Sequence, residues 1–369
     1  MLKRIYIDNY KSLVKFDLSL TPLNLFLGPN GAGKSTVFEV LRKLRDFISG
    51  DRKLSDLFGD ITRTRQLTLR IQTFELEIEG NQGLYKYELT VEHDELGQKV
   101  SVKYERLWFD NAPLFQFEQE RMHLFRDDTT PGPVYAINLT TSGSAVIFPS
   151  PENNKLTWFR DYIKQIIVVQ VTPQLMRADS DQEEIIPSDH FENFVSWYRH
   201  LSQDQEITLS VTETIRKVLP GFDFFRFEPY GEHNRVLKAI YNTNTGKQKY
   251  SYTFTELSDG ERCLICLYIL LQAASKKGYL LCLDEPENFL ALPEIQPWLI
   301  KLYDLCQEMD FQTLLISHHP EFINYLLASP VGYWFDRDQN LLTRVKAIKS
   351  EAGEGFPISE LIARGWLYG

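Results

Sequence analysis

The pattern of hydrophobic and polar residues changes period several times along the chain. Apolar residues alternate over Lys3–Ile7 and run unbroken over Leu23–Leu27, and both stretches predict strands. After Gly28, apolar residues return at helical spacing over 37–48, and Gly50 is placed to end that helix. The N-terminal region therefore predicts a strand, a glycine-rich turn and a helix in immediate succession.

Alternation of apolar and polar residues begins near Leu67 and continues to Phe117. Four stretches separated by glycine-containing turns predict an antiparallel sheet, namely LTLRIQTFELEIEG, YKYELTVEH, KVSVKYERLWF and LFQFEQE. Residues 128–160 follow neither period, so we predict irregular structure there. The run IIVVQV at 166–171 predicts a further strand.

The rest of the chain mixes helical and strand patterns. Helices are predicted at 188–203 and 207–219, and strands near 222–229, 234–242 and 248–255. A second αβ core is predicted from a helix that opens at Asp259, a strand at 279–283, a helix at 294–308 and a strand at 313–317. We expect an α/β protein in three parts: an N-terminal part with an antiparallel β subdomain (1–170), an inserted helical/β lobe (171–250) and a C-terminal part (251–369).

The composition is typical of a soluble chain that forms a hydrophobic core. Of 369 residues, 43% are apolar and 13% are aromatic. The longest apolar run, Cys263–Leu271, is too short to cross a bilayer, so we expect a cytoplasmic protein with no membrane partner. Four cysteines are too few for a disulfide framework, and we predict that Cys263 and Cys266 pack in a helix rather than bind a metal.

Charge is distributed unevenly along the chain. The first 70 residues contain 13 Lys/Arg and 7 Asp/Glu, whereas the remaining residues contain 27 and 43. The early basic residues include Arg42, Lys43, Arg45, Arg52, Lys53, Arg63, Arg65 and Arg70. We interpret most of them as solvated surface charge, and the alternative is a local basic face that contacts the phosphates of DNA.

The strongest chemical signal follows the strand at Leu23–Leu27. The sequence GPNGAGKST at 28–36 satisfies the pattern G-x-x-x-x-G-K-S at a strand-to-helix junction. Its glycines let backbone N–H groups curl around phosphate oxygens, Lys34 is placed to reach the β and γ phosphates, and the Ser35 hydroxyl is placed to coordinate Mg²⁺. The predicted nucleotide-binding residues are Asn30, Gly31, Ala32, Gly33, Lys34, Ser35 and Thr36.

A second chemical motif is the acidic pair Asp284-Glu285, which follows an apolar strand. Ligands of open α/β sheets bind at the carboxyl ends of the strands, where this pair is expected. Asp284 would hold Mg²⁺ through water, and Glu285 would orient and polarise the attacking water. An acidic pair in this position can instead cap a helix, but the loop at 28–36 favours the metal-binding interpretation.

Two further motifs lie at the ends of predicted elements. Ser258 and Glu261 predict a capping box at the start of a helix, and Gly260 would leave room for a phosphate at the helix N-terminus. The alternative there is a well-capped core helix. The strand at 313–317 is followed by His318 and His319, and one of these histidines could hydrogen-bond a γ-phosphate.

In this order the motifs resemble the ABC-type ATPases of the SMC and RecF kind. The resemblance is greatest to the compact branch that includes the ATPase part of OLD-family proteins, and it covers about 1–120 and 250–325. It implies a P-loop NTPase fold of ABC-ATPase type, with 28–36 as the Walker A loop. Asp284 is then the Walker B aspartate, Glu285 the catalytic glutamate and LSDGE the signature motif.

The resemblance also implies roles that need a second subunit. Two subunits would enclose two ATP molecules, and Ser258 and Gly260 of each would contact the γ-phosphate bound by the other. ATP would therefore promote a homodimer, and hydrolysis would release it. The switch histidine of the family falls on His318, and either Gln170 or Gln174 is the candidate Q-loop glutamine.

The chain departs from the family pattern at two places. The segment 287–293 lacks the histidine of the family's Leu-His-Pro segment and is one residue longer, so we do not carry over the family's communication between the two ATP sites. Only about 50 residues follow His318, among them Asp336-Arg337-Asp338. That length is too short for the Toprim nuclease of OLD-family proteins, so we assign no nuclease to this chain.

These observations predict an Mg²⁺-dependent ATPase that acts as a switch. It would control a separate effector protein, such as a nuclease or toxin, or act on DNA, as in DNA repair or anti-phage defence. One alternative is a nucleotide-gated scaffold with negligible hydrolysis. Another is the ATP-binding subunit of a transporter. The acidic signature motif disfavours it, and so does the separation of about 220 residues between the Walker A loop and that motif, which is longer than in transporter subunits.

Overall fold

The computed structural model describes residues 1–242, 248–308, 311–319, 323–324 and 332–348. They form two compact units. The first combines Met1–Ile166 with a hairpin of β17 (Gly332–Arg337) and β18 (Thr343–Ala347), and the second begins at Ile167. The three-part division of the chain at 170 and 250 stays a prediction.

The first unit contains an eight-stranded sheet in the order β2-β1-β4-β5-β6-β7-β8-β9, and each neighbouring pair is antiparallel. The antiparallel sheet predicted from the alternating pattern is therefore confirmed. Its strands are β1 (Leu2–Asp8), β2 (Phe16–Ser19), β4 (Ile71–Gly80), β5 (Gly83–His93), β6 (Val100–Phe109), β7 (Ala112–Glu118), β8 (Arg121–Phe125) and β9 (Pro131–Ala136).

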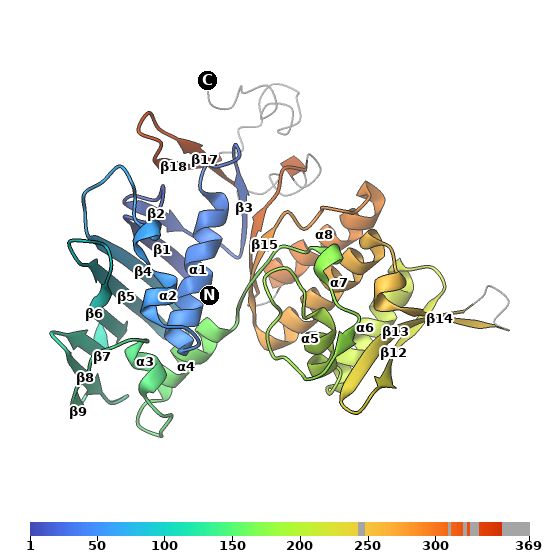
Figure 1. Cartoon of the computed structure of the whole chain (residues 1–369), viewed down its shortest axis with the longest axis horizontal. Helices are drawn as coiled ribbons and strands as arrows, with labels where there is room; N and C mark the ends of the chain where they lie inside the picture. The colour runs from blue at the N-terminus through green and yellow to red at the C-terminus, as the bar shows by residue number, and fades with distance from the viewer. Residues whose placement is uncertain (243–247, 309–310, 320–322, 325–331, 349–369) are drawn as a thin grey trace. The chain divides into compact units, whose positions relative to one another are not determined.

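Helix α1 (Lys34–Ser49) lies against this sheet with α4 (Asn154–Lys164) beside it, and α2 (Leu54–Leu57) follows α1 (Figure 1). The apolar face of α1 is buried, and Gly50 ends the helix in a left-handed conformation, as predicted. The loop before α1 comes from β3 (Leu23–Leu27), which pairs in parallel with β17. The C-terminal hairpin thus packs beside the strand that leads into the Walker A loop.

The prediction of irregular structure over 128–160 is wrong. This stretch contains β9, the short helix α3 (Gly143–Val146) and most of α4. Strand β9 is the last strand of the sheet, with nearly every side chain exposed and two prolines, so it shows no alternation. Helix α4 buries only a short apolar face, which is hard to recognise in eleven residues.

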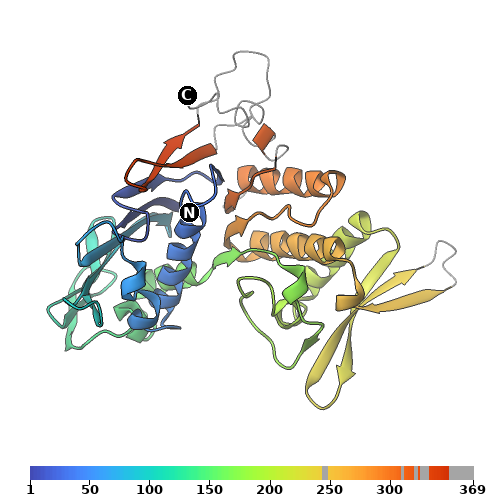
Figure 2. The same cartoon turned by 45° about the horizontal axis from the view of Figure 1, so that its top comes forward.

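In the second unit, β10 (Ile166–Val169) lies next to β15 (Leu280–Asp284), which pairs in parallel with β16 (Gln312–Ile316). Helices α7 (Asp259–Lys277) and α8 (Leu292–Glu308) run side by side (Figure 2). Helix α7 is buried along most of its length, which explains its unbroken apolar run Cys263–Leu271.

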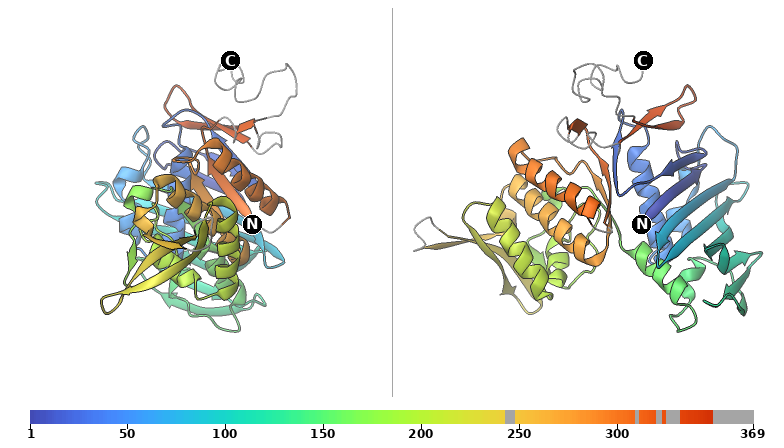
Figure 3. Two further views of the ribbon diagram at one scale, coloured as in Figure 1. Left: turned by 90° about the vertical axis from the view of Figure 1, so that its right-hand side faces the viewer. Right: turned by 180° about the vertical axis from the view of Figure 1, so that it is seen from behind.

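The inserted region forms a small sheet covered by helix α6, seen from behind in Figure 3. Its order is β11-β13-β12, and β14 also pairs with β13. The elements are β11 (Asp179–Ser180), α5 (Phe194–Leu201), α6 (Gln205–Val218), β12 (Phe222–Tyr230), β13 (Asn234–Asn242) and β14 (Lys249–Thr253). The helix predicted at 207–219 and the three strands predicted near 222–229, 234–242 and 248–255 are confirmed to within two residues at each end. The helix predicted at 188–203 was placed too long, because α5 begins only at Phe194 and ends at Leu201.

All four cysteines are buried as free thiols, consistent with a packing role. Among the described residues, no helix is both long enough and apolar enough to span a bilayer. Within the same residues, no cluster of three or more His, Cys, Asp or Glu side chains could bind a metal by itself.

Candidate nucleotide-binding and hydrolysis residues

The Walker A loop connects the end of β3 to the first turn of α1. Gly28, Gly31 and Gly33 have φ angles of 135°, 77° and 101°, a region that residues with a side chain rarely adopt. The Lys34 ammonium is almost fully buried and donates to the carbonyl oxygens of Gly28 at 2.7 Å and Pro29 at 3.0 Å. This curled glycine backbone, with a lysine inside it, fits the phosphates of a nucleotide.

The C-terminal hairpin contacts this loop at its glycines. A Cβ atom on Gly28 would lie 2.0 Å from the backbone oxygen of Phe335. A Cβ atom on Gly33 would lie 2.4 Å from the Thr343 hydroxyl oxygen, which is itself 2.8 Å from both the Ala32 carbonyl oxygen and the Ser12 hydroxyl oxygen. The loop therefore has room for glycine only at these two positions.

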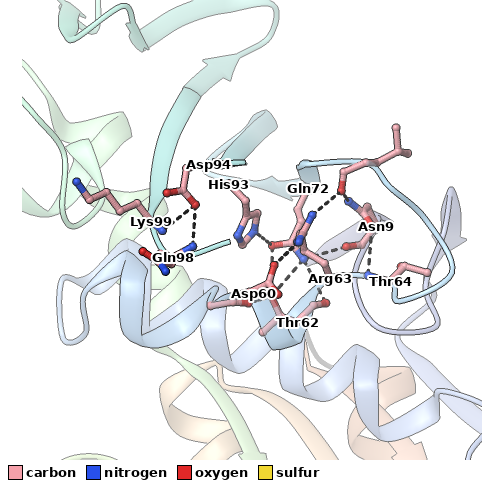
Figure 4. Close-up of polar contacts among 12 residues, drawn as sticks. Asn9, Asp60, Thr62, Arg63, Thr64, Gln72, His93, Asp94, Gln98 and Lys99 are labelled. Carbon is pink, nitrogen blue, oxygen red and sulfur yellow. Dashed lines mark hydrogen bonds and ion pairs between the residues drawn. The ribbon is translucent and has the colours of Figure 1, made fainter. Parts of the chain in front are cut away.

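A buried polar network supports the turn that carries Ser12 (Figure 4). The Asn9 amide donates to the carbonyl oxygens of Leu69 and Ile71, and its oxygen accepts from the Thr64 N–H. The Gln72 amide donates to the carbonyl oxygens of Asn9 and Thr62. These bonds fix the chain just before Ser12, so the support of the Walker A loop extends into the eight-stranded sheet.

The second unit carries the acidic pair at the end of β15. The Glu285 N–H donates to the Ile316 carbonyl oxygen at 2.9 Å, which joins the ends of β15 and β16. One Glu285 carboxylate oxygen lies 3.7 Å from His318 Nε2, and the other accepts from the Asn288 amide at 2.9 Å. The next helix, α8, begins only at Leu292, so the acidic pair does not cap a helix.

Glu287 is the one buried carboxylate in this turn. Its Oε1 accepts from the Ser317 hydroxyl at 2.5 Å and from the His318 N–H at 3.3 Å. Burial raises the pKa of Glu287, while these two hydrogen bonds oppose the shift.

The signature segment opens α7 as predicted. Ser258 caps the helix by accepting from the Glu261 N–H, and the Glu261 carboxylate accepts from the Ser258 N–H at 2.9 Å, so the predicted capping box is confirmed. A Cβ atom on Gly260 would lie 3.0 Å from the Phe289 carbonyl oxygen. Gly260 therefore faces the turn after β15 at close range.

The two Q-loop candidates have different surroundings. The Gln174 amide donates to the Asp259 carboxylate in the signature segment, and Arg262 of the same helix donates to the Pro173 carbonyl oxygen at 2.6 Å. The Gln170 backbone N–H donates to the Asp189 carbonyl oxygen at 2.8 Å. Of the two glutamines, Gln174 is the one whose side chain contacts the signature helix.

The early basic residues do not form one continuous set of unpaired charges. Lys43, Arg45, Arg63 and Arg70 each lie within 4 Å of a carboxylate. Arg52, Lys53 and Arg65 are exposed, and in the described part of the chain they make no ion pair. Any DNA contact would therefore depend on a smaller set than the sequence suggested.

The predicted site residues fall into two groups. The Walker A residues Asn30–Thr36 belong to the first unit, whereas Ser258, Gly260, Asp284, Glu285, His318 and both glutamines belong to the second. Within the second unit, Glu285 and His318 lie together, as do Gln174 and the signature segment. The sequence reasoning missed Ser12, Thr343 and Asn288, because no local pattern distinguishes them from ordinary loop and strand residues.

Comparison with known proteins identifies related sequences. The family model described as "AAA domain, putative AbiEii toxin, Type IV TA system" matches residues 23–324. The chain is 43% identical to the OLD nuclease of Thermus scotoductus over 51 residues, a stretch that covers 14% of this chain and 9% of that protein. It is also 31% identical to ATP-binding cassette sub-family F member 2 of Mus musculus over 122 residues, a stretch that covers 33% of this chain and 17% of that protein. The chain thus matches less than a fifth of either relative.

Solved structures share the fold at low sequence identity. The SMC head domain from Thermotoga maritima matches with a TM-score of 0.50 and 14% identity, covering 94% of this chain and 99% of that one. An SMC head bound to the C-winged helix domain of ScpA matches with a TM-score of 0.53 and 13% identity, covering 95% and 98%. The predicted P-loop NTPase fold of ABC-ATPase type is confirmed.

Proposed function

The chain belongs to the AAA-domain family whose model spans residues 23–324, and from this premise we propose that it is an ATP-hydrolysing switch. It is an ATPase of the SMC-like ABC type that resembles OLD proteins. The proposal concerns what such a chain does with its nucleotide: it binds ATP, dimerises around it, and hydrolyses it to change state.

In this proposal the Walker A loop binds the triphosphate. The backbone N–H groups of Asn30–Gly33 and of the first turn of α1 face the phosphate oxygens, and Lys34 exchanges its bonds to loop carbonyls for the β and γ phosphates. Ser35 and Asp284 supply the hydroxyl and carboxylate oxygens that Mg²⁺ prefers, and the ion would neutralise charge on the phosphates. Thr36 completes the motif.

Hydrolysis is assigned to Glu285 and His318. The carboxylate of Glu285 accepts a hydrogen bond from the attacking water, which orients the water in line with the phosphorus–oxygen bond that breaks. His318 lies 3.7 Å from that carboxylate. In this proposal it donates to the γ-phosphate and responds to its loss. The Q-loop role is assigned to Gln174 or Gln170.

We assign Ser258 and Gly260 to the ATP bound by a second copy of the chain. The Ser258 N-cap and the first N–H groups of α7 form a positive helix end that suits a γ-phosphate. Each site is then complete only in a homodimer that holds two ATP molecules. ATP favours the dimer because it binds the dimer more tightly than the monomer.

The dimer is proposed to act on a separate effector, a nuclease or toxin, or on DNA, in DNA repair or anti-phage defence. The family description names a toxin system and one relative is an OLD nuclease, and both support this assignment. The second candidate is a nucleotide-gated scaffold with negligible hydrolysis. The side-by-side placement of Glu285 and His318 favours hydrolysis over that alternative.

The proximity of Glu285 to His318 at the end of β15 is the observation that carries the proposal, and Glu285→Gln tests it. The wild-type protein should release phosphate from ATP. The variant should lose turnover, keep ATP affinity and accumulate as an ATP-bound dimer, because the amide is too weak a base to activate water. A scaffold would show equal, negligible phosphate release from both proteins.

A further inference from the structure

The turn Glu285–Phe289, between β15 and α8, includes the first residues of the segment 287–293 that departs from the family pattern. Glu285 and Phe289 have left-handed backbones, with φ angles of 48° and 73°. The Asn288 N–H donates to the Glu285 carbonyl oxygen at 3.2 Å and so closes the turn. Left-handed residues other than glycine cost ~1–3 kcal/mol each, so contacts around the turn must hold it in this form.

Asn288 bonds the carboxylate that we assign to hydrolysis. Its Nδ2 donates to Glu285 Oε2 at 2.9 Å, while Glu285 Oε1 lies 3.7 Å from His318 Nε2. Oε2 of Glu285 is thus held by the Asn288 amide, which donates to it, and Oε1 is directed toward His318. Asn288 itself is exposed, so its side chain contributes little to the packed core.

Glu287 bonds the backbone that carries the switch histidine. Its Oε1 accepts from both the Ser317 hydroxyl and the His318 N–H, so it holds the chain where His318 leaves β16. The other oxygen, Oε2, is buried and has no hydrogen-bond partner in the described residues. A buried carboxylate with an unpaired oxygen lowers stability. The two bonds of Oε1 to Ser317 and His318 are the contacts that tie Glu287 to the switch histidine.

The same turn is attached to the signature helix. The Cys263 thiol donates to the Asn288 carbonyl oxygen at 3.4 Å, and Gly260 faces the Phe289 carbonyl oxygen at the distance given above. The turn therefore contains the proposed catalytic glutamate and contacts both the switch histidine and the start of α7. All of these contacts lie within the second unit.

We propose that Glu287 and Asn288 are positioning residues for ATP hydrolysis: Asn288 orients the Glu285 carboxylate and Glu287 fixes the position of His318. This inference rests on the proposed function. Neither residue belongs to the Walker A loop, so losing either one lowers turnover without weakening nucleotide binding. The altered segment then has a role within each subunit, in setting the geometry of the two hydrolysis residues.

The test measures kcat, KM and ATP affinity for four variants: Asn288→Ala, Glu287→Ala, Glu287→Gln and the control Asn234→Ala. Asn234 is the first residue of β13 in the same unit, and its side chain makes no hydrogen bond to the described residues. Asn288→Ala and Glu287→Ala should each lower kcat at least about tenfold, a part of the effect of a general base, with KM and affinity changed less than about threefold. Glu287→Gln keeps an acceptor oxygen for Ser317 and His318, so it should retain most of the kcat that Glu287→Ala loses. Asn234→Ala should match the wild type.

The positioning role of Asn288 would be overturned if Asn288→Ala kept the wild-type kcat. The role of Glu287 would be overturned if Glu287→Gln lost as much kcat as Glu287→Ala. A rise in KM with kcat unchanged would also overturn these roles. These failures are distinct from failure of the proposed function, which is read from the wild type and Glu285→Gln. If those two proteins differ in turnover as expected while Asn288→Ala and Glu287→Ala behave as wild type, only the present inference is wrong.

Discussion

The backbone of Gly28 and the backbone of Phe335 are in direct contact, although more than 300 residues separate them in the sequence. The space where a side chain of Gly28 would begin is filled by the Phe335 carbonyl oxygen, at 2.0 Å from a Cβ atom built there. Parallel pairing of β3 with β17 brings the two residues together, since Leu27 is the register partner of Trp334. The start of the Walker A loop is thus shaped by the C-terminal hairpin.

Replacing Gly28 with alanine should damage the loop severely. The added methyl group must displace the β17 backbone, so we expect loss of ATP binding together with a destabilisation of more than ~3 kcal/mol. Gly231→Ala is the matched control, because Gly231 also has a positive φ of 70° but nothing within 4 Å of its Cβ position. The control should cost only ~1 kcal/mol. Thermal unfolding and ATP titration measure both effects, and equal behaviour of the two variants would refute the contact.

Thr343 should support ATP affinity from outside the Walker A motif. Its hydroxyl is 2.8 Å from the Ala32 carbonyl oxygen and from the Ser12 hydroxyl. Thr343→Val removes both bonds and leaves buried polar atoms unpaired, a cost of ~1–3 kcal/mol. We expect weaker ATP binding in Thr343→Val and near-normal binding in Thr343→Ser, which keeps the hydroxyl. Equal affinities in isothermal titration would show that the hairpin does not support the loop.

Glu105 should make stability depend on pH. It is fully buried, accepting bonds from the Tyr87 hydroxyl at 2.9 Å and the Gly143 N–H at 2.7 Å, and burial raises its pKa from 4.5 to about 7. The folded state binds the proton more tightly than the unfolded state, so stability falls as pH rises from 4.5 to 7.

The loss from this group should be on the order of 3 kcal/mol above pH 7. Glu105→Gln cannot ionise and can still accept from the Gly143 N–H, so its stability should change less over the same range. Denaturant unfolding between pH 5 and pH 8 tests this. A pH dependence shared fully by the variant would assign it to other groups.

DNA binding should weaken as the salt concentration rises, with a slope set by a small number of phosphate contacts. Arg52, Lys53 and Arg65 are the exposed members of the early basic group that make no ion pair in the described structure. Three phosphate contacts give a slope of log K against log salt of about −3 or shallower, since each contact contributes about −0.9 on duplex DNA. Replacing all three residues by alanine should remove most of the slope. An unchanged slope would place the DNA contact elsewhere, and no binding in the presence of ATP would reject it.

Local sequence patterns predicted those parts of the fold whose periods are regular. Strands β4–β7 and helix α1 each bury one face, so apolar residues recur in them at the period of a strand or a helix. Helix α7 is buried on nearly all sides, and its central run is apolar throughout. The strands before the glycine-rich loop and before the acidic pair were predicted correctly, because each is a short, unbroken apolar run. The edge strand β9 and the short helix α4 carry weaker patterns and were missed.

Contacts between distant segments could not be predicted from one sequence. Nothing in the local pattern shows that Thr343 packs against Gly33, or that Glu287 is buried against Ser317. The burial of Glu287 in particular could not be expected, because glutamate side chains are ordinarily exposed. Such contacts depend on which strands pair in the sheet, and strand pairing is decided by the whole chain.

The central claim is that ATP is held between the Walker A loop of one copy and the signature helix of another, and complementation between two inactive variants tests it most directly. Lys34→Ala removes ATP binding to its own loop, and Ser258→Arg blocks the site of its partner. In a mixed dimer, the loop of the Ser258→Arg copy faces the intact signature helix of the Lys34→Ala copy. An equal mixture of the two inactive proteins should therefore recover up to about a quarter of wild-type turnover, since about half the dimers are mixed and each has one complete site. A mixture as inactive as its two components would contradict the claim.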